Sequence, residues 1–368
     1  MKLSGGDDMA HTILIMAGGT GGHVFPGLAV AAWLQDRGWR VVWLGTQHGM
    51  ETILVPQHGF LLETIQFSAV RGKKPMDFVL LPWRLQRACW QSLRILRRLR
   101  PDVVLGLGGY PALPGGMMTV LLGIPLIIHE QNTVAGLTNK VLAKIADRIL
   151  LAFPGALQGN EKKVQVTGNP IRAEITGLPS PEDRYAKRTG KLKLLVVGGS
   201  LGAQKLNTVM PQALAMIDKA QRPQVTHQAG GAHFAGLEKT YAEFGVSAQL
   251  VAFIEDMATQ YAENDLVICR AGALTISELA AAGVASILVP YPHAVDDHQT
   301  SNARFLSDAK AAVLWPQSEL TPASLAHWLR QCSRESLQAM AVKARQLARP
   351  DATAQVASSC EEILEPAR

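Results

Sequence analysis

Two residues in the first half of the chain have side chains that could take part in acid–base chemistry. His23 follows the glycine-rich sequence Gly18-Gly-Thr-Gly-Gly22, and Glu130 ends the apolar run that begins at Leu126. A histidine at a glycine-rich helix entry can contact a phosphate or act as a base, although it can also simply cap the turn. Polar groups at the carboxyl ends of parallel strands face the ligand-binding crevice, so Glu130 could be a base or bind a hydroxyl group. An ordinary surface carboxylate is the alternative for Glu130.

The sequence from Leu266 to Glu278 has the pattern of an anion-binding turn. Leu266–Cys269 is apolar and long enough for a buried strand, Gly272 interrupts it, and a helix is expected to follow. The N-terminus of such a helix presents free backbone N–H groups and a partial positive charge to an anion. Glu278 lies one turn into this helix, where its carboxylate could reach sugar hydroxyls beside a bound phosphate. An ordinary strand–helix unit of a parallel sheet has the same pattern when taken alone.

The glycine-rich loop before His23 belongs to neither of the two common nucleotide-binding types. No Gly-Lys-Ser/Thr sequence closes it, as a Walker loop would require. The next expected strand, Val41–Leu44, ends at Gly45-Thr46, where a nicotinamide enzyme would carry an acidic residue for the ribose. The pattern of strand, glycine-rich loop and helix then recurs from Leu192 to Gly202. We therefore expect an α/β chain with two Rossmann-like halves.

Positive charge is concentrated between Arg71 and Arg100. This segment holds nine basic residues and one acidic residue, a net charge of +8, whereas the whole chain carries +6. It includes the apolar run Phe78–Trp83, and helical spacing over the residues that follow places Trp90 among arginines. Such a surface is typical of binding to an anionic membrane, where each basic residue contributes on the order of 1 kcal/mol. A solvated helix face or a nucleic-acid interface is the alternative.

The composition limits the architecture and the compartment. A chain of 368 residues with 48% hydrophobic residues is long enough for two domains. Its four cysteines include no C-x-x-C pair, which favours a reducing cytoplasm over a disulfide framework or a zinc site. No apolar run reaches the roughly 18–20 residues that span a bilayer, so we expect a soluble or peripheral protein. The polar segment Gly177–Gly190 is expected to be an interdomain linker, and a final helix, about Ala354 to Leu364, could return to the first domain.

Several short motifs, none of them specific alone, occur together in a distinctive order and spacing. They are Gly18-Gly-Thr-Gly-Gly-His23, His129-Glu-Gln-Asn132, Gly168-Asn-Pro170, Gly198-Gly-Ser200, the Arg270–Glu278 turn and His293-x-x-Asp-Asp-His-Gln299. In combination they closely resemble the bacterial enzymes of glycosyltransferase family 28, over nearly the whole chain. The resemblance implies a GT-B fold, in which two Rossmann-like domains face a central cleft. Residues 1–172 and the C-terminal helix 351–368 would form the acceptor and membrane domain, and residues 173–350 the UDP-sugar donor domain.

The resemblance also implies an activity in peptidoglycan synthesis. It is the inverting transfer of N-acetylglucosamine from UDP-N-acetylglucosamine to the C4 hydroxyl of undecaprenyl-diphospho-N-acetylmuramoyl-pentapeptide. The enzyme would be a peripheral protein at the cytoplasmic face of the bacterial inner membrane, with an anionic membrane surface and no nucleic acid as a partner. No metal and no other cofactor are expected. The chain has no D-x-D pair, and this suits a fold in which a helix N-terminus and loop amides stabilise the leaving diphosphate.

The same resemblance gives roles to individual residues. His23 and Glu130, in that order, are the candidates for the base on the acceptor hydroxyl. Glu278 would hold the ribose hydroxyls, Ile254 would meet the uracil through its backbone, and Arg172 would contact the nucleotide. The other expected substrate-binding residues lie around the diphosphate (Ser200, Ala273, Leu274, Thr275, Ile276 and Ser277), at the sugar (Gln299 and Asn132) and in the first glycine-rich loop (Thr20, Gly21 and Gly22).

Three other functions stay open at this point. A UDP-N-acetylglucosamine 2-epimerase of the same fold would share the donor but would need no lipid acceptor, so the basic segment argues against it. A glycosyltransferase for another membrane lipid would differ in its acceptor alone. A membrane-bound sensor of nucleotide sugar would bind without turnover and would leave His23 and Glu130 without a role.

Overall fold

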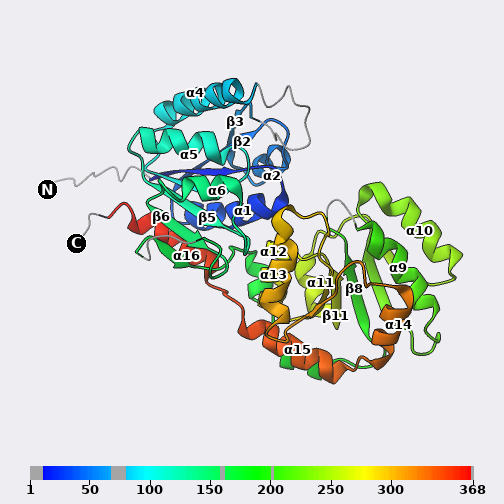
Figure 1. Ribbon diagram of the computed structural model, residues 1–368. Coiled ribbons are helices and arrows are strands. Elements are labelled where there is room, and N and C mark those ends of the chain that lie inside the picture. Colours follow the sequence, from blue (N-terminus) through cyan, green and yellow to red (C-terminus); the bar gives the residue numbers. More distant parts are fainter. Residues whose placement is uncertain (1–10, 68–79, 158–161, 200–202, 366–368) are drawn as a thin grey trace. The chain divides into compact units, whose positions relative to one another are not determined.

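The computed structural model describes residues 11–67, 80–157, 162–199 and 203–365, and the chain in it divides into two α/β units (Figure 1). The first unit comprises Met1–Ile171 and Asp351–Arg368, and the second comprises Arg172–Pro350. The boundary lies one residue before the position expected from the sequence.

The first unit is built on a seven-stranded sheet in the order β3-β2-β1-β4-β5-β6-β7, with every pair parallel. Its strands are β1 (Thr12–Ala17), β2 (Arg40–Thr46), β3 (Leu61–Ile65), β4 (Val103–Gly108), β5 (Leu126–Glu130), β6 (Arg148–Leu151) and β7 (Val164–Val166). The helices are α1 (Gly21–Gln35), α2 (Glu51–Gln57), α4 (Leu81–Leu99), α5 (Ala112–Leu121), α6 (Leu137–Leu142) and α16 (Ala352–Glu362).

Both faces of this sheet are buried, because side chains alternate along each strand. On β1, Ile13 and Ile15 belong to the core that includes residues of α1 and α16. Leu14 and Met16 point to the opposite face and belong to the core that includes residues of α4 and α5. The sheet is thus the middle layer between two layers of helices.

The second unit repeats this plan on a six-stranded parallel sheet in the order β10-β9-β8-β11-β12-β13. Its strands are β8 (Lys193–Val197), β9 (Gln224–Gln228), β10 (Gln249–Val251), β11 (Leu266–Cys269), β12 (Ala285–Leu288) and β13 (Val313–Leu314). The helices are α7 (Ala173–Thr176), α8 (Pro181–Ala186), α9 (Gln204–Ala215), α10 (Phe234–Glu243), α11 (Met257–Glu263), α12 (Ala273–Ala282), α13 (His298–Ser307), α14 (Pro322–Gln331) and α15 (Arg334–Gln346).

Contrary to the expectation from the sequence, the segment Gly177–Gly190 is not an interdomain linker. It lies inside the second unit and forms α8, whose N-terminus is capped by Ser180 accepting a hydrogen bond from the Asp183 amide. Arg184 of this helix is buried and donates to the carbonyl oxygens of Tyr261 and Ala282. The polar composition of the segment did not indicate that it packs inside a domain. An arginine can be buried when backbone carbonyls alone satisfy its hydrogen-bond donors.

The first helix also begins earlier than expected. Because proline is favoured at the first helical position, the sequence predicts a helix from about Pro26 to Arg37. In the structure α1 begins at Gly21, so that Pro26 lies inside it. Thr20 adopts an extended backbone, and its carbonyl accepts hydrogen bonds from the amides of His23 and Val24. This first turn places His23 on the helix itself. Within the described ranges, no helix combines the length and the apolar character that crossing a membrane would require.

Candidate active site

The first glycine-rich loop is held in place by backbone contacts and by one buried carboxylate. A second glycine-rich segment, Gly108–Gly116, begins at the end of β4. A side chain at Gly109, whose φ is +79°, would come within 2.3 Å of the Gly18 carbonyl oxygen, so this segment and the loop at Gly18 touch through their backbones. Glu51 is fully buried and accepts hydrogen bonds from the amides of Gly19 and Thr46, each at 2.9 Å, and from the Thr46 hydroxyl at 2.7 Å. Thr20, Gly21 and Gly22 follow this fixed loop, at the N-cap and first turn of α1.

His23 is half-buried and is connected to the strand β5 through Gln131. Its Nδ1 lies 2.9 Å from Gln131 Oε1, and Gln131 Nε2 lies 3.1 Å from Nδ1 of His129. His129 is fully buried, and its Nε2 lies 2.9 Å from the Gly168 carbonyl oxygen. Burial lowers the pKa of His129 to about 4, because desolvation disfavours the charged ring. A side chain at Gly108 would meet the His23 ring at 3.1 Å, so glycine leaves room for it.

Glu130, the second candidate base, has a different environment. It is 2% exposed, and its carboxylate accepts hydrogen bonds from the Asn132 amide at 2.9 Å and the Gly136 amide at 3.1 Å. The side-chain nitrogens of Asn132 and Asn139 add two more, at 3.2 and 2.9 Å. This carboxylate therefore organises the loop after β5 and places Asn132 there.

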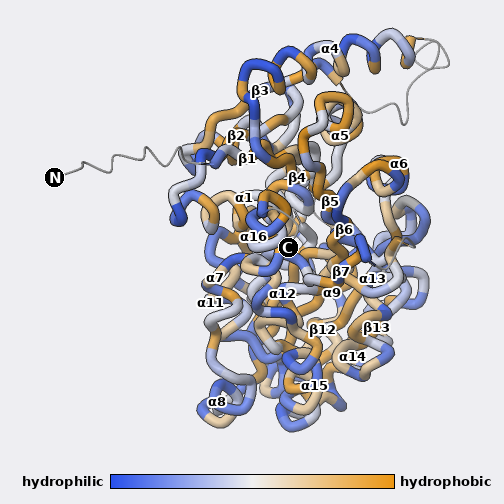
Figure 2. Tube along the Cα trace, turned by 90° about the vertical axis from the view of Figure 1, so that its left-hand side faces the viewer, coloured by the Kyte–Doolittle hydropathy of each residue, from blue (hydrophilic) through white to orange (hydrophobic). Residues whose placement is uncertain are grey.

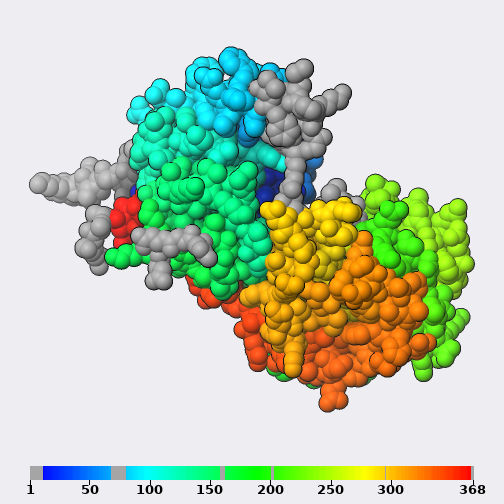
Figure 3. All heavy atoms as spheres, viewed as in Figure 1, coloured from blue at the N-terminus to red at the C-terminus, as the bar shows by residue number. Residues whose placement is uncertain are grey.

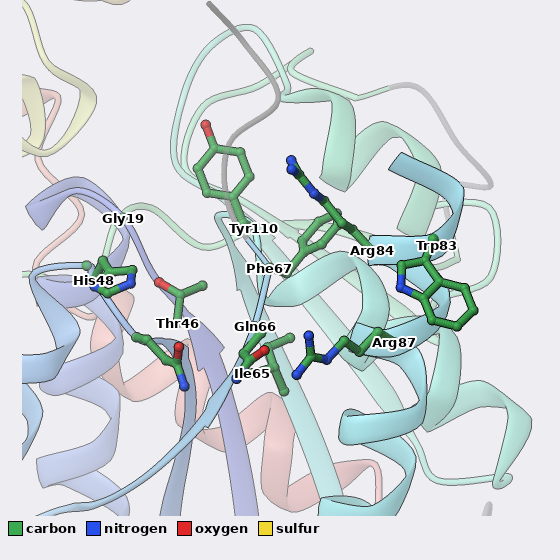
Figure 4. A pocket seen from close by; sticks show the side chains of 12 residues that line it. Gly19, Thr46, His48, Ile65, Gln66, Phe67, Trp83, Arg84, Arg87 and Tyr110 are labelled. Carbon is green, nitrogen blue, oxygen red and sulfur yellow. The ribbon is translucent and has the colours of Figure 1, made fainter. Parts of the chain in front are cut away.

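A pocket of about 600 Å³ lies beside the glycine-rich loop within the first unit (Figure 4). Residues from α4 and from the four segments at the carboxyl ends of β1, β2, β3 and β4 line it: Gly19, Thr46, Gln47, His48, Gly49, Ile65, Gln66, Phe67, Trp83, Arg84, Arg87 and Tyr110. In Figure 4 the guanidinium groups of Arg84 and Arg87 extend from α4 toward Tyr110 and Gln66. Two cations and several hydrogen-bonding groups suit an anionic, hydroxylated ligand.

In the second unit, Glu278 is held between two partners. Tyr261 donates its hydroxyl to Glu278 Oε2 at 3.0 Å, and Arg172 Nη2 lies 3.2 Å from Oε1. Burial raises the pKa of Glu278, and the Arg172 charge and the Tyr261 hydrogen bond oppose this shift. Glu278 and Arg172, two separately predicted nucleotide contacts, are thus in direct contact in the structure.

The turn before Glu278 has the predicted strand–glycine–helix form. Gly272 caps α12 in an extended conformation without a side-chain cap, and no acidic residue lies in the first turn. Leu274 and Thr275 are partly exposed, whereas Ala273 and Ile276 are buried. The Ile276 amide bonds to the Gly272 carbonyl, and the Ser277 hydroxyl donates to the Ala273 carbonyl.

Of the remaining residues predicted to bind the donor, Gln299 and Ile254 lie in the second unit. Gln299 lies in the first turn of α13, and its Oε1 accepts a hydrogen bond from the Tyr291 amide at 2.9 Å. Its NH2 group is therefore the end that can donate to a ligand. Ile254 follows β10 and is partly buried. Ser200 lies outside the described residues.

Three positions beside the site were not found from the sequence. Gln131 lies within a recognised motif, but its role as a link between two histidines depends on the fold. Glu51 and Tyr261 lie 32 and 17 residues from their partners Gly19 and Glu278, and no motif connects them. Exposed Phe253, beside Ile254, is a further candidate contact because 61% of its surface is accessible.

Comparison with known proteins identifies the family. The N-terminal domain of glycosyltransferase family 28 matches residues 13–151, and its C-terminal domain matches residues 193–357. A Nitrosomonas europaea protein is 71% identical over 95% of this chain and 98% of its own. It is named UDP-N-acetylglucosamine–N-acetylmuramyl-(pentapeptide) pyrophosphoryl-undecaprenol N-acetylglucosamine transferase.

Solved structures agree with this family. The crystal structure of Acinetobacter baumannii MurG has a TM-score of 0.82 and 42% identity, covering 96% of this chain and 99% of that one. A UDP-N-acetylglucosamine 2-epimerase has a TM-score of 0.64 at 13% identity, covering 94% of each chain, and this likeness concerns the fold alone. The chain therefore belongs to glycosyltransferase family 28, and its two α/β units have the GT-B fold that the sequence predicted.

Proposed function

We propose that this enzyme transfers N-acetylglucosamine from UDP-N-acetylglucosamine to the C4 hydroxyl of undecaprenyl-diphospho-N-acetylmuramoyl-pentapeptide, with inversion at the anomeric carbon. The observation that carries the proposal is the high identity, along nearly the whole chain, to a relative whose name states this donor and this acceptor. The residues of the two units provide the chemistry that such a transfer needs.

In the second unit, Glu278 accepts hydrogen bonds from the ribose hydroxyls, and Arg172 contacts the nucleotide. The backbone at Ile254 meets the uracil, and Gln299 donates to the sugar, as Asn132 does from the first unit. The uncapped N-terminus of α12 at Leu274 and Thr275, together with the loop at Ser200, binds the diphosphate. This assignment is supported by the uncapped helix and by the absence of acidic residues in its first turn.

In the first unit, His23 is the base. The acceptor oxygen forms its bond to the anomeric carbon while the bond from that carbon to the diphosphate oxygen breaks. The electron pair leaves with UDP, and the acceptor proton passes to the free nitrogen of His23. The four hydrogen bonds that Glu130 accepts support a structural role for it and make His23 the better candidate. Thr20, Gly21 and Gly22 line the acceptor side.

The pocket beside the glycine-rich loop is proposed to receive an anionic part of the acceptor. The acceptor carries a diphosphate and peptide carboxylates, and Arg84 and Arg87 provide matching charges. The Gly19 amide is already bonded to Glu51, so the two arginines provide the contacts to the anion in this proposal.

The enzyme is also proposed to bind the cytoplasmic face of the inner membrane through its first unit. Trp83 and Trp90 on α4 are 68% and 56% exposed, and the Arg94 guanidinium lies 4.6 Å over the Trp90 ring. Helix α4 forms part of the surface of the first unit (Figure 3). Helical spacing predicts an inward stripe of Leu85, Ala88, Cys89, Leu96 and Leu99 on α4. Of these, Ala88 and Leu96 are buried in the core and the others are partly buried. Lys73 and Lys74 of the basic segment lie outside the described residues.

Neighbouring helices extend the apolar character of this surface. Helix α5 packs against both α4 and α6. In Figure 2, α5 and α6 include hydrophobic residues, drawn in orange. Leu121 and Leu137 are 67% and 79% exposed, and Lys140 and Lys144 stand close to Leu137 in the chain. Exposed apolar residues with lysines are the chemistry that an anionic lipid surface attracts.

The proposed function is tested by a transfer assay with radiolabelled UDP-N-acetylglucosamine and three acceptors in parallel. These are the lipid-diphosphate muramoyl-pentapeptide, the carrier lipid diphosphate without sugar, and no acceptor. Label should enter the lipid phase with the first acceptor alone. Formation of UDP-N-acetylmannosamine would instead indicate an epimerase, and label on the second acceptor would indicate another lipid glycosyltransferase.

A further inference from the structure

We propose that Gln131 and His129 are positioning residues that fix the proton of His23 on Nδ1 and so keep its Nε2 free as the base. This inference rests on the proposed transfer reaction and on His23 as its base. The chain of hydrogen bonds from His23 through Gln131 and His129 to Gly168 joins three sequence motifs of the first unit.

The direction of the chain is set at its buried end. The Gly168 carbonyl oxygen can only accept, so His129 must carry a proton on Nε2. His129 is buried and neutral, because desolvation lowers its pKa to about 4. A neutral ring has a single N–H, and therefore Nδ1 of His129 is an acceptor.

The orientation of the Gln131 amide follows. An acceptor at His129 Nδ1 requires the amide NH2 group there, at 3.1 Å. The His129 backbone carbonyl gives the same orientation independently, since it lies 3.2 Å from Gln131 Nε2 and also needs a donor. Asn169 further holds the Gln131 backbone by donating to its carbonyl at 3.1 Å. The amide therefore points its oxygen at His23.

The last link determines the tautomer of His23. Gln131 Oε1 can only accept, so Nδ1 of His23 must donate across the 2.9 Å contact. In the neutral ring this leaves a lone pair on Nε2. Among the described residues, Nε2 of His23 has no hydrogen-bond partner. Gly108 supports this placement, because a side chain there would lie 3.1 Å from the ring and displace it.

The test is nitrogen-15 NMR of the full chain labelled at histidine, with long-range correlations from ring protons to both ring nitrogens. The His23 signals are those that disappear in His23→Gln. At a pH where this ring is neutral, we expect a proton on Nδ1 and a bare Nε2. A wild-type His23 protonated on Nε2 would overturn the inference, whether or not the enzyme transfers N-acetylglucosamine.

Two substitutions of similar size distinguish a role of Gln131 in positioning the His23 proton from a purely structural role. Gln131→Met removes both polar ends, so the His23 tautomers should mix and kcat should fall roughly ten- to a hundredfold, part of the about 10²–10⁴-fold that a positioned base supplies. KM for both substrates should not change. Gln131→Glu should preserve the tautomer and most of kcat. One oxygen of the new carboxyl group still accepts from His23, and the other shares a proton with Nδ1 of His129, whichever of the two atoms carries it. Equal loss of kcat in both variants, with the His23 tautomer unchanged, would contradict the inference, and the wild-type spectrum decides it if Gln131→Met does not fold.

Discussion

Glu278 shows at the scale of one residue how two partners orient a buried carboxylate. Its carboxylate is nearly inaccessible, yet both oxygens have partners in Tyr261 and Arg172. A buried carboxylate without such partners would be costly. Ribose hydroxyls would therefore meet an acceptor that is already oriented.

Glu278→Gln is expected to raise KM for UDP-N-acetylglucosamine by roughly 10- to 100-fold, because hydrogen bonds to a charged acceptor are stronger than those to an amide. Glu263→Gln, an exposed carboxylate of the same unit, is the control and should leave KM unchanged. Steady-state kinetics at several donor concentrations provide the measurement. An unchanged KM in Glu278→Gln would remove this residue from the donor site.

The raised pKa of Glu278 adds a pH dependence with a definite sign. Protonation removes the charged acceptor, so donor affinity should be present above the pKa and should decline as pH falls through it. Because burial moves this pKa upward, the decline should begin at a higher pH than for an ordinary glutamate. Donor binding by calorimetry across pH should show this decline in the wild type. The same decline in Glu278→Gln would assign it to another group.

Glu51 has a comparable role for the glycine-rich loop. Glu51→Gln would place an NH2 group against the N–H donors of Gly19 and Thr46, and we expect a loss of about 1–3 kcal/mol in the free energy of unfolding. Denaturant unfolding measures this loss. Glu63→Gln is not a suitable control, because Glu63 is partly buried and pairs with Arg98. Glu335→Gln in the second unit is the better control. A Glu51→Gln variant as stable as the wild type would show that the loop does not depend on this carboxylate.

Sequence patterns pointed to His23, Glu130 and Glu278 as candidates because each follows a strand or a glycine turn, where parallel sheets usually bind ligands. They could not distinguish the environments of His23 and Glu130. That distinction depends on Asn132, Gly136 and Asn139 folding back onto Glu130, a short-range geometry that residue types alone do not determine.

At the scale of elements, α4 carries the proposed membrane contact. Its helical period is visible in the sequence, because apolar residues such as Leu85, Ala88, Leu96 and Leu99 recur at helical spacing between arginines. The helix α8 was missed because its six residues are too few to show such a period, although Ser180, Pro181 and the acidic residues that follow are typical of a helix start.

The triple substitution Trp90→Gln, Arg94→Gln, Arg97→Gln should reduce binding to anionic vesicles by roughly tenfold or more, since each lost charge removes on the order of 1 kcal/mol. None of the three residues lines the pocket, so kcat on a water-soluble acceptor should be preserved. Co-sedimentation with vesicles measures binding, and the effect should shrink at high salt. Lys187→Gln with Lys219→Gln is the control for net charge. Wild-type vesicle binding by the triple variant at low salt would refute this surface.

At the scale of the whole molecule, the recurrence of one strand–loop–helix pattern predicted two similar units. The family resemblance also implied that the C-terminal helix belongs to the first unit, which makes that unit discontinuous in sequence: α15 lies within Arg172–Pro350 and α16 within Asp351–Arg368. In α16, Val356, Ala357 and Cys360 are fully buried in the core with residues of α1, and Glu362 pairs with Arg148 at 2.7 Å.

Val356→Ala should therefore destabilise the first unit by about 2 kcal/mol. Hydrogen exchange read by mass spectrometry should become faster in peptides of β1 and α1, while peptides of β8 and β11 should exchange at the wild-type rate. Acceleration confined to the second unit would contradict the placement of α16.

The central claim is most directly tested by the rate at which radiolabel from UDP-N-acetylglucosamine enters the lipid-linked muramoyl-pentapeptide, measured for the wild type and His23→Gln side by side. We predict transfer by the wild type, and in the variant a kcat lower by about 10²–10⁴-fold with donor affinity retained. Absence of label in the lipid product with active wild-type protein would contradict the transferase function. Equal rates for the two proteins would leave the transfer intact and exclude His23 as its base.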